Sequence, residues 1–361
     1  MRFLFTLLIQ STANISVKII TSVFILFFST IISAEEEQKQ LAVDNDIEII
    51  VVTAQKRVEN IQEVPISIAS FNGEQIDRMA LRQLNEVAEF VPNLKMSQTN
   101  DFSSNITIRG VGSSSRNIGF DARVGLYLDG VYIGQSPAHN QDLLDLERIE
   151  VLRGPQGTLF GKNNVAGSIN LITKKPEDEF SGNVGVSFGN YDLRQYSASL
   201  NTPINEDIAA KFSINQYKRD GYIENIATGS WLNEQDSYSY RGQIRANLSD
   251  NIEINFAIDG LKSDRLSFDG EPITNTLGTD VNTESPARNK VSFDVDPFEE
   301  REIRGESLTI DWQLNNDFIV KSITGHRDSK INYINDFDFS AQSVSFLDYE
   351  DDYNQWSQEL Q

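Results

Sequence analysis

The feature that most constrains the fold is a regular alternation of apolar and polar residues in the second half of the chain. Four segments place apolar residues at alternate positions: Ala210, Phe212 and Ile214; Tyr238, Tyr240, Ile244, Ala246 and Leu248; Ile252, Ile254, Phe256 and Ile258; Leu308, Ile310, Trp312 and Leu314. Successive side chains of a β-strand point to opposite faces, so each segment predicts a strand with one apolar and one polar face.

The connections between these strands also alternate in length. Short polar turns are expected at Asn205–Asp207, Ser249–Asn251 and Asn315–Asp317, and longer acidic loops at 221–235 and 264–306. Short turns at one end and long loops at the other are typical of an outer-membrane barrel. A soluble β-sandwich alternates as well. The charged polar face, which carries Arg and Glu, favours the barrel.

The first half of the chain has a different pattern, which predicts a compact α/β domain over residues 59–176. Pro65–Phe71 is strand-like, and Gly73–Phe90 has the apolar spacing of a helix that ends before Pro92. Val124–Ile133 predicts a hairpin that turns at Asp129–Gly130.

The run Val151–Pro176 closes this domain with a glycine-rich turn followed by a strand. Gly154, Pro155 and Gly157 predict a tight turn, and Ile169–Thr173 an extended segment. A phosphate loop requires G-x-x-x-x-G-K-[S/T]. Here Asn163 follows Gly161-Lys162, and Gln156 stands where the first glycine is needed. A nucleotide site is therefore disfavoured.

Composition excludes several classes of function. The 361 residues include 53 acidic and 31 basic ones, for a net charge of −22, which argues against nucleic acid as a partner. There is no cysteine, and the two histidines are His139 and His326. These residues are too few for a histidine metal centre, and a thiolate centre requires cysteine. A catalytic triad with a histidine base is disfavoured for the same reason. We therefore expect no cofactor, no metal site and no enzymatic activity.

The N-terminal residues 1–34 read as an export signal. Lys18 precedes the apolar run Ile19–Ser33, and Ala34 is a small residue before an acidic stretch. A membrane-anchoring helix is the alternative, but the run is shorter than the roughly 18 apolar residues that spanning requires. Residues 35–58 are predicted to be flexible and to end in the β-branched run Ile47–Ala54. Such a run is suited to pairing with a strand of a partner.

Several of these segments, in this order, resemble the motifs of TonB-dependent outer-membrane receptors. The resemblance to the Ton box covers Glu48, Ile49, Ile50, Val51, Val52, Thr53 and Ala54. Val64–Ile68, Ile108–Gly112, Val124–Gly134 and Val151–Pro176 resemble successive plug motifs, and residues 180–361 the first barrel strands. The resemblance implies a signal peptide at 1–34, a Ton box segment at 35–58, an α/β plug at 59–176 and a membrane β-barrel from 177.

The resemblance also implies a function. Such receptors lie in the outer membrane of Gram-negative bacteria and actively import a small extracellular ligand, most commonly a ferric siderophore. TonB, acting with ExbB–ExbD, drives this import, and outer-membrane lipid surrounds the barrel. The same machinery could import cobalamin or a glycan, and a passive or structural barrel is the alternative from another class.

Two sets of plug residues are expected to matter beyond the Ton box. The structural motif comprises Arg109, Gly110, Arg153, Gly154, Pro155, Gly157 and Gly161. The two arginines end strands, and the resemblance implies acidic partners for them on the barrel. Turn-rich segments predict ligand contacts at Arg116, Asn117, Gln135, His139 and Asn140, with plain solvated loops as an equal alternative.

The size of the chain sets a further expectation. The residues after 176 suffice for about eight strands of roughly ten residues with their loops, whereas the resemblance implies about 22 strands. A plug of this length has a radius of gyration of roughly 13 Å. It does not fit inside an eight-stranded barrel, whose own side chains fill its interior. The sequence is therefore expected to be the N-terminal fragment of a larger receptor.

Overall fold

The computed structural model describes residues 50–53, 56–57, 59–98, 104–112, 122–140, 142–268, 270 and 287–361. The chain divides into two units, residues 1–48 and 49–361. The first unit, which includes the predicted signal segment 1–34, lies outside the described residues. Within the described ranges, no helix has both the length and the apolar character needed to span a bilayer.

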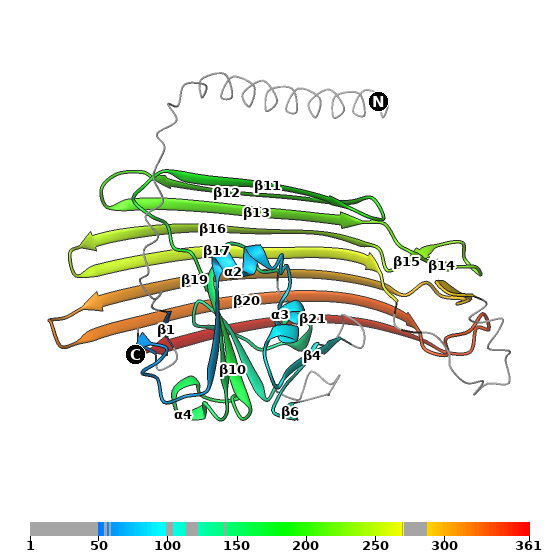
Figure 1. Ribbon diagram of the computed structural model, residues 1–361, viewed down its shortest axis with the longest axis horizontal. Helices are drawn as coiled ribbons and strands as arrows, with labels where there is room; N and C mark the ends of the chain where they lie inside the picture. Colours follow the sequence, from blue (N-terminus) through cyan, green and yellow to red (C-terminus); the bar gives the residue numbers. More distant parts are fainter. Residues whose placement is uncertain are drawn as a thin grey trace, which may run out of the picture. The chain divides into compact units, whose positions relative to one another are not determined.

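Residues from 181 onward form one antiparallel sheet of eight long strands, which we call the wall (Figure 1). Each strand pairs with the long strands before and after it in sequence. The strands are β11 (Ser181–Gly189), β12 (Leu193–Pro203), β13 (Ile208–Arg219), β16 (Gln235–Ser249), β17 (Ile252–Leu266), β19 (Phe298–Gln313), β20 (Ile319–Asp336) and β21 (Phe346–Leu360). The wall is open, because among the described residues β11 and β21 have one neighbour each.

The two faces of the wall have opposite chemistry. Phe212 on the outer face is 50% exposed, whereas its neighbour Ser213 is 1% exposed. The same holds on β16, where Ile244 is exposed while Arg241 and Gln243 are buried. An apolar outer face with a polar inner face is the arrangement of a transmembrane barrel and the reverse of a soluble sandwich. This confirms the predicted class of antiparallel membrane barrel.

The longer connections lie at one end of the wall and carry a small sheet of their own. Its order is β15-β14-β18, with β14 (Ile223–Asn225), β15 (Trp231–Leu232) and β18 (Lys290–Val291). Ile223, Leu232, Val291 and Phe293 form its buried core. At the opposite end of the wall, short turns such as Asp250–Asn251 join the strands. The ends are therefore as unequal as the sequence predicts.

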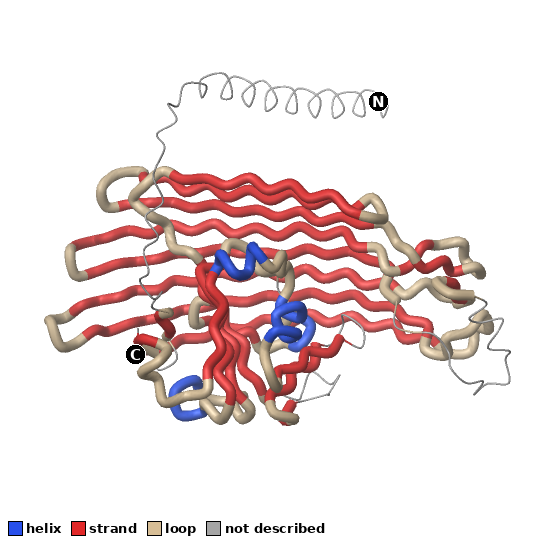
Figure 2. Tube along the Cα trace, in the orientation of Figure 1, coloured by secondary structure: helices blue, strands red, loops and turns tan. Residues whose placement is uncertain are grey.

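The predicted plug domain, called the plug below, has a five-stranded sheet with the order β3-β9-β10-β7-β8. Figure 2 shows the plug strands in red, together with the short helices in blue. Only the β10–β7 pair is parallel. The elements of the plug apart from its helices 73–90 are β2 (Glu59–Asn60), β3 (Ile68–Asn72), β4 (Leu94–Gln98), β5 (Ser104–Ile108), β6 (Val111–Gly112), β7 (Val124–Leu128), β8 (Val131–Ile133), η2 (Ser136–Ala138), β9 (Leu146–Arg153), α4 (Gly157–Phe160) and β10 (Gly167–Thr173). The hairpin β7–β8 turns at Asp129 and Gly130, both with positive φ, as the sequence predicts.

The predicted single helix 73–90 is wrong: the structure has three short ones. They are α2 (Gly73–Arg78), α3 (Leu84–Val87) and the 3-10 helix η1 (Ala88–Phe90). Ala80 adopts a left-handed φ of 52°, and the Leu81 N–H donates to the Ile76 carbonyl, which is the bond that closes a Schellman cap. The turn lets Leu81, Leu84 and Ile76 all reach the same buried core.

The plug core extends into the wall. Leu261 of β17 and Ile303 of β19 belong to the same buried cluster as Leu126, Ile169 and Leu171 of the plug sheet. The plug and the wall therefore share one apolar core on this side.

Candidate functional site

The predicted Ton box contributes β1 (Val51–Val52), which pairs antiparallel with β2. Val52 is 0% exposed and packs with Val64 and Leu152. Burial of Val52 thus docks β1 on the plug, whereas the flexibility predicted for residues 35–58 stays a prediction. Glu48, Ile49 and Ala54 lie outside the described residues.

A buried carboxylate holds the end of this strand. Glu150 of β9 is fully buried and accepts hydrogen bonds from the Thr53 N–H (2.7 Å) and the Thr53 hydroxyl (3.0 Å). Arg148 lies two residues away on the same face of β9, and its Nε donates to Glu150 at 2.8 Å. No local pattern in the sequence indicates this role for Glu150, since its partner Thr53 is 97 positions away in the chain.

The outer edge of β1 is free to pair with another strand. The Ile61 N–H donates to the Ile50 carbonyl at 2.9 Å, so Ile50 and Ile61 form a hydrogen-bonded pair. Bonded and non-bonded pairs alternate in an antiparallel ladder. The next pair, Val51 with Asn60, is therefore non-bonded, and the Val51 N–H points away from β2. Among the described strands, β2 is the only neighbour of β1.

Lys56 connects the segment that follows the Ton box to the wall. Its Nζ lies 2.8 Å from a carboxylate oxygen of Glu359 on β21 and 4.4 Å from the ring centre of Phe160. The ammonium thus has an anion on one side and an aromatic face on the other, both of which stabilise a cation.

The glycine-rich motif forms the turn between β9 and β10. Gly154 and Gly161 have positive φ values of 123° and 77°. Asn164, which the sequence analysis did not single out, closes the turn from within. Its Nδ2 donates to the Tyr127 hydroxyl at 2.7 Å and to the Lys162 carbonyl at 2.7 Å. Pro155 and Gly157 lie in the exposed part of the turn.

Arg109 and Arg153 lie at the ends of their strands, as predicted. Arg109 and Gly110 form the left-handed turn between β5 and β6, and Arg153 Nη1 donates to the Pro92 carbonyl at 3.3 Å. Within the part of the chain that the structure describes, neither guanidinium has a carboxylate partner. The predicted acidic partners on the barrel stay a prediction.

The predicted ligand residues fall into two groups. Gln135 is half-buried at the end of β8, whereas His139 and Asn140 are each 1% exposed. Asn140 Nδ2 donates to Gln83, and its Oδ1 accepts from the Asn85 N–H. Asn140 therefore connects the turn after β8 to the start of α3. The predicted ligand contacts of Gln135, His139 and Asn140 stay a prediction. Arg116 and Asn117 lie outside the described residues.

Burial of His139 makes the plug sensitive to acid. Its Nε2–H donates to the Ile133 carbonyl at 3.2 Å, Nδ1 has no partner, and burial lowers the pKa of His139 to about 4 from an ordinary 6.5. As the pH falls, His139 is therefore protonated in the unfolded chain at a higher pH than in the folded plug. We expect the free energy of plug unfolding to drop by about 3 kcal/mol between roughly pH 6.5 and 4 from this group.

His139→Gln, which keeps a donor for Ile133, should make this pH dependence weaker. Urea unfolding at several pH values measures it for both proteins. Stability curves that stay parallel from pH 7 to 4 would show that His139 is not the acid-sensitive group.

Charged groups link the tip of the β7–β8 hairpin to the wall. Arg241 of β16 pairs with Asp129 at the tip, and also with Asp259 of β17 at 3.1 Å. Arg327 of β20 completes the network by pairing with the second oxygen of Asp259 at 2.5 Å. Asp129 also accepts from the Thr173 N–H at 2.9 Å. The hairpin tip is thus paired directly with β16, and Arg241 connects it to Asp259 of β17 and Arg327 of β20. Nowhere in the described ranges do three or more histidine or acidic side chains form a group able to hold a metal ion.

Comparison with known proteins identifies this arrangement. Residues 60–168 match the family described as TonB-dependent Receptor Plug Domain, which begins at β2 and ends within β10. This part of the chain is therefore a plug domain of the TonB-dependent receptor family. The eight wall strands that follow it have the antiparallel arrangement of part of an outer-membrane barrel. The proteins of this family are receptors and transporters rather than enzymes.

Two relatives of this receptor show how far the similarity reaches. An iron-regulated outer membrane virulence protein of Vibrio cholerae is 33% identical over 144 residues, which are 39% of this chain and 22% of that protein. The ferric-pyoverdine 358 receptor of Pseudomonas putida is 28% identical over 240 residues, which are 65% of this chain and 28% of that receptor. The chain thus matches less than a third of the length of either relative.

A solved structure has the same fold. The ferric yersiniabactin uptake receptor of Yersinia pestis superposes with a TM-score of 0.71 at 23% identity, over 82% of this chain and 45% of that one. The superposed part includes both plug and wall strands, since neither alone makes up 82% of the chain.

Proposed function

We propose that this receptor imports a ferric siderophore across the outer membrane, powered by TonB. The observation that carries the proposal is the joint presence of a plug, a polar-lined wall and a docked strand with a free edge at the predicted Ton box. The names of the relatives support the cargo, because they include a ferric-pyoverdine receptor and a ferric yersiniabactin uptake receptor.

In this proposal TonB adds a strand to the free edge of β1. The Val51 N–H points outward, and Val51 is exposed while Val52 is buried. A partner strand can therefore pair with β1 without first displacing β2, which is the geometry of β-augmentation. ExbB–ExbD would energise TonB, and the exposed apolar face of the wall, with Phe212 and Trp312, would contact outer-membrane lipid.

Uptake of radioactive iron tests the function. Cells that express the receptor as its host makes it are given ferric pyoverdine, ferric yersiniabactin, cobalamin or an oligosaccharide, with and without TonB. TonB-dependent uptake of a ferric siderophore is the expected result. TonB-dependent uptake of cobalamin or glycan alone would show that the cargo is not a siderophore. Uptake that does not change without TonB would indicate a passive pore.

Loss of the Glu150 charge should release the Ton box. In Glu150→Gln the Thr53 N–H and Arg148 lose a charged acceptor, and such bonds are each worth about 1.5–3 kcal/mol. If the free energy that holds β1 on the plug falls by about 1.4 kcal/mol, the population in which β1 is undocked rises roughly tenfold. Labelling of a Val52→Cys thiol measures this opening, since Val52 is fully buried.

Glu147→Gln is the matched control for this variant. Glu147 pairs with the same Arg148, but its side chain is half exposed, and an exposed pair contributes little to stability. Equal labelling rates in the Glu150→Gln and Glu147→Gln proteins would show that Glu150 does not hold the Ton box.

A further inference from the structure

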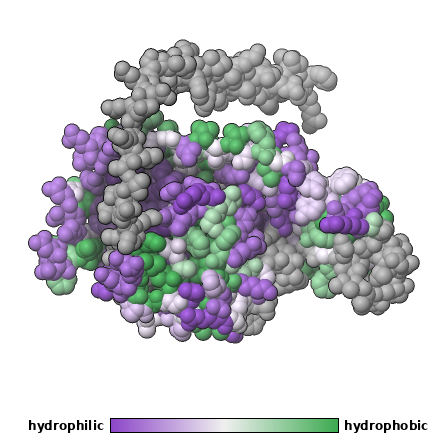
Figure 3. All heavy atoms as spheres, viewed as in Figure 1, coloured by the Kyte–Doolittle hydropathy of each residue, from purple (hydrophilic) through white to green (hydrophobic). Residues whose placement is uncertain are grey.

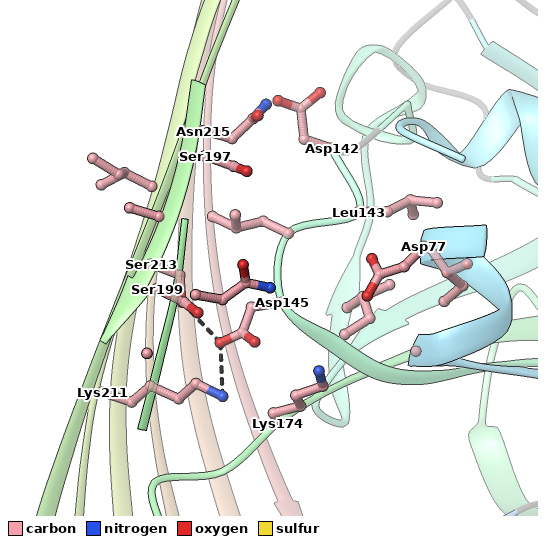
Figure 4. Close-up of a pocket in the computed structure, with 18 of the residues that line it drawn as sticks. Asp77, Asp142, Leu143, Asp145, Lys174, Ser197, Ser199, Lys211, Ser213 and Asn215 are labelled. Carbon is pink, nitrogen blue, oxygen red and sulfur yellow. Dashed lines mark hydrogen bonds and ion pairs between the residues drawn. The ribbon is translucent and has the colours of Figure 1, made fainter. Parts of the chain in front are cut away.

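The plug meets the first strands of the wall across a polar cavity of about 490 Å³. It lies between α2, the loop 142–146 and strands β11, β12 and β13, and Figure 4 shows Asp142 facing Ser197 and Asn215 across it. The space-filling view shows hydrophilic residues on the wall beside the plug (Figure 3). A water molecule needs only about 10–15 Å³, so the cavity has room for many.

A single carboxylate links the loop 142–146 to β13. Asp145 accepts from Lys211 Nζ at 2.9 Å and from the Ser213 hydroxyl at 2.8 Å (Figure 4). Both Asp145 and Lys211 are nearly buried. At the margins of the cavity, Gln243 of β16 donates to the Lys174 carbonyl, and the Arg82 guanidinium lies over the ring of Tyr217. We call this contact with β11–β13 the polar seam.

The contact of the plug with β17, β19 and β20 is dry by comparison. Leu261 and Ile303 are part of the plug core. A Cβ placed on Gly325 of β20 would lie 2.5 Å from a methyl carbon of Val131, so the two backbones approach closely. The void between the plug and strands β16, β17 and β19 is only about 40 Å³. We call this contact the dry face.

The two contacts differ in what separation costs. At the polar seam, the cavity has room for water beside the loop, and the freed polar groups can exchange their partners for water. At the dry face, separation exposes apolar surface to water and removes close packing. It also breaks the ion pair between Asp129 of the plug and the buried Arg241 of the wall, which leaves a buried charge without its partner. A force on the plug therefore opens the seam before the dry face.

We propose that the imported solute passes the plug along β11–β13, in the space that opens when Asp145 leaves Lys211 and Ser213, while the dry face stays closed. The inference rests on the proposed uptake function and adds its route. The lining of carboxylates, amides, hydroxyls and ammonium groups suits a hydrophilic chelate that exchanges hydrogen bonds as it moves.

Two disulfide tethers test the route. The chain contains no cysteine, so introduced pairs have no competing thiol. Asp145→Cys with Ser213→Cys closes the polar seam, and Val131→Cys with Gly325→Cys closes the dry face. In cells expressing the receptor as its host makes it, we expect the oxidised seam tether to reduce uptake of the siderophore to the level of cells without receptor. Reductant should restore it, and the dry-face tether should leave uptake near that of wild type.

Uptake by the wild-type protein distinguishes a wrong route from a wrong function. If wild type imports the siderophore and the oxidised seam tether does too, or only the dry-face tether blocks import, the route is wrong. If wild type shows no TonB-dependent import, the proposed function itself fails.

Thiol labelling tests the route even if one of the disulfide tethers does not form. Ser197→Cys in the seam should label faster with siderophore and TonB present, while Ile303→Cys on the dry face should not, and the reverse order would overturn the route.

Discussion

Replacing Val51 with proline is expected to abolish TonB-dependent uptake while ligand binding at the cell surface remains. Proline removes the N–H that points outward from β1, and with it a bond that an added strand would accept. The ladder with β2 persists, because Val51 and Asn60 form a non-bonded pair. Ile50 is paired with Ile61 through its carbonyl, which suits the extended backbone that a residue before proline prefers. Paired measurements of siderophore binding and uptake in whole cells distinguish the two effects.

Val51→Thr is the control, since threonine keeps both the donor and the β-branched shape. It should transport at nearly the rate of wild type. Undiminished uptake in Val51→Pro would exclude β1 as the pairing site of TonB, and loss of binding in the same variant would show a folding defect instead.

Substitution of Gly167 by alanine is expected to destabilise the plug strongly. Gly167 begins β10, and a Cβ there would lie 2.2 Å from the Leu152 carbonyl oxygen and 2.8 Å from Ile108 Cδ1. Backbone on β9 cannot move aside without disturbing the ladder between Arg153 and Gly167. Overpacking of this kind costs about 1–3 kcal/mol or more. Thermolysin digestion of the purified receptor in increasing urea measures the loss.

Gly157→Ala is the matched control from the same motif. A Cβ on Gly157 has open space around it, and alanine at the start of α4 should be neutral or stabilising by up to about 1 kcal/mol. If the two variants unfold at the same urea concentration, steric fit at β10 does not explain why glycine is needed there.

The sequence predicts most of the architecture because local patterns determine it. Alternation of Phe212 with Ser213 fixes which side of β13 faces outward, and Asp129–Gly130 fixes the turn of the β7–β8 hairpin. The glycine-rich motif predicts the turn between β9 and β10. In each of these cases the physical cause lies within a few residues of the feature it produces.

The site is less predictable because its contacts are distant in sequence. Nothing near Glu150 distinguishes it from the other acidic residues, yet it alone meets Thr53 in the core of the plug. Asp145 finds Lys211 only once the plug and the wall are together. The break at Ala80 and the burial of His139 likewise depend on packing, which overrides the local helical and polar patterns.

The bond between Thr53 and Glu150 gives tension on β1 a direct path through the plug. A pulling force on β1 would act through the hydrogen bond between Thr53 and the Glu150 carboxylate, and then on the backbone of β9. β9 is an inner strand of the plug sheet. Asp145 immediately precedes that strand, roughly 16 Å from Glu150 at the rise of an extended chain. In the proposed mechanism, a pull by TonB on β1 is carried along β9 to Asp145, whose contact with Lys211 and Ser213 is the one proposed to open.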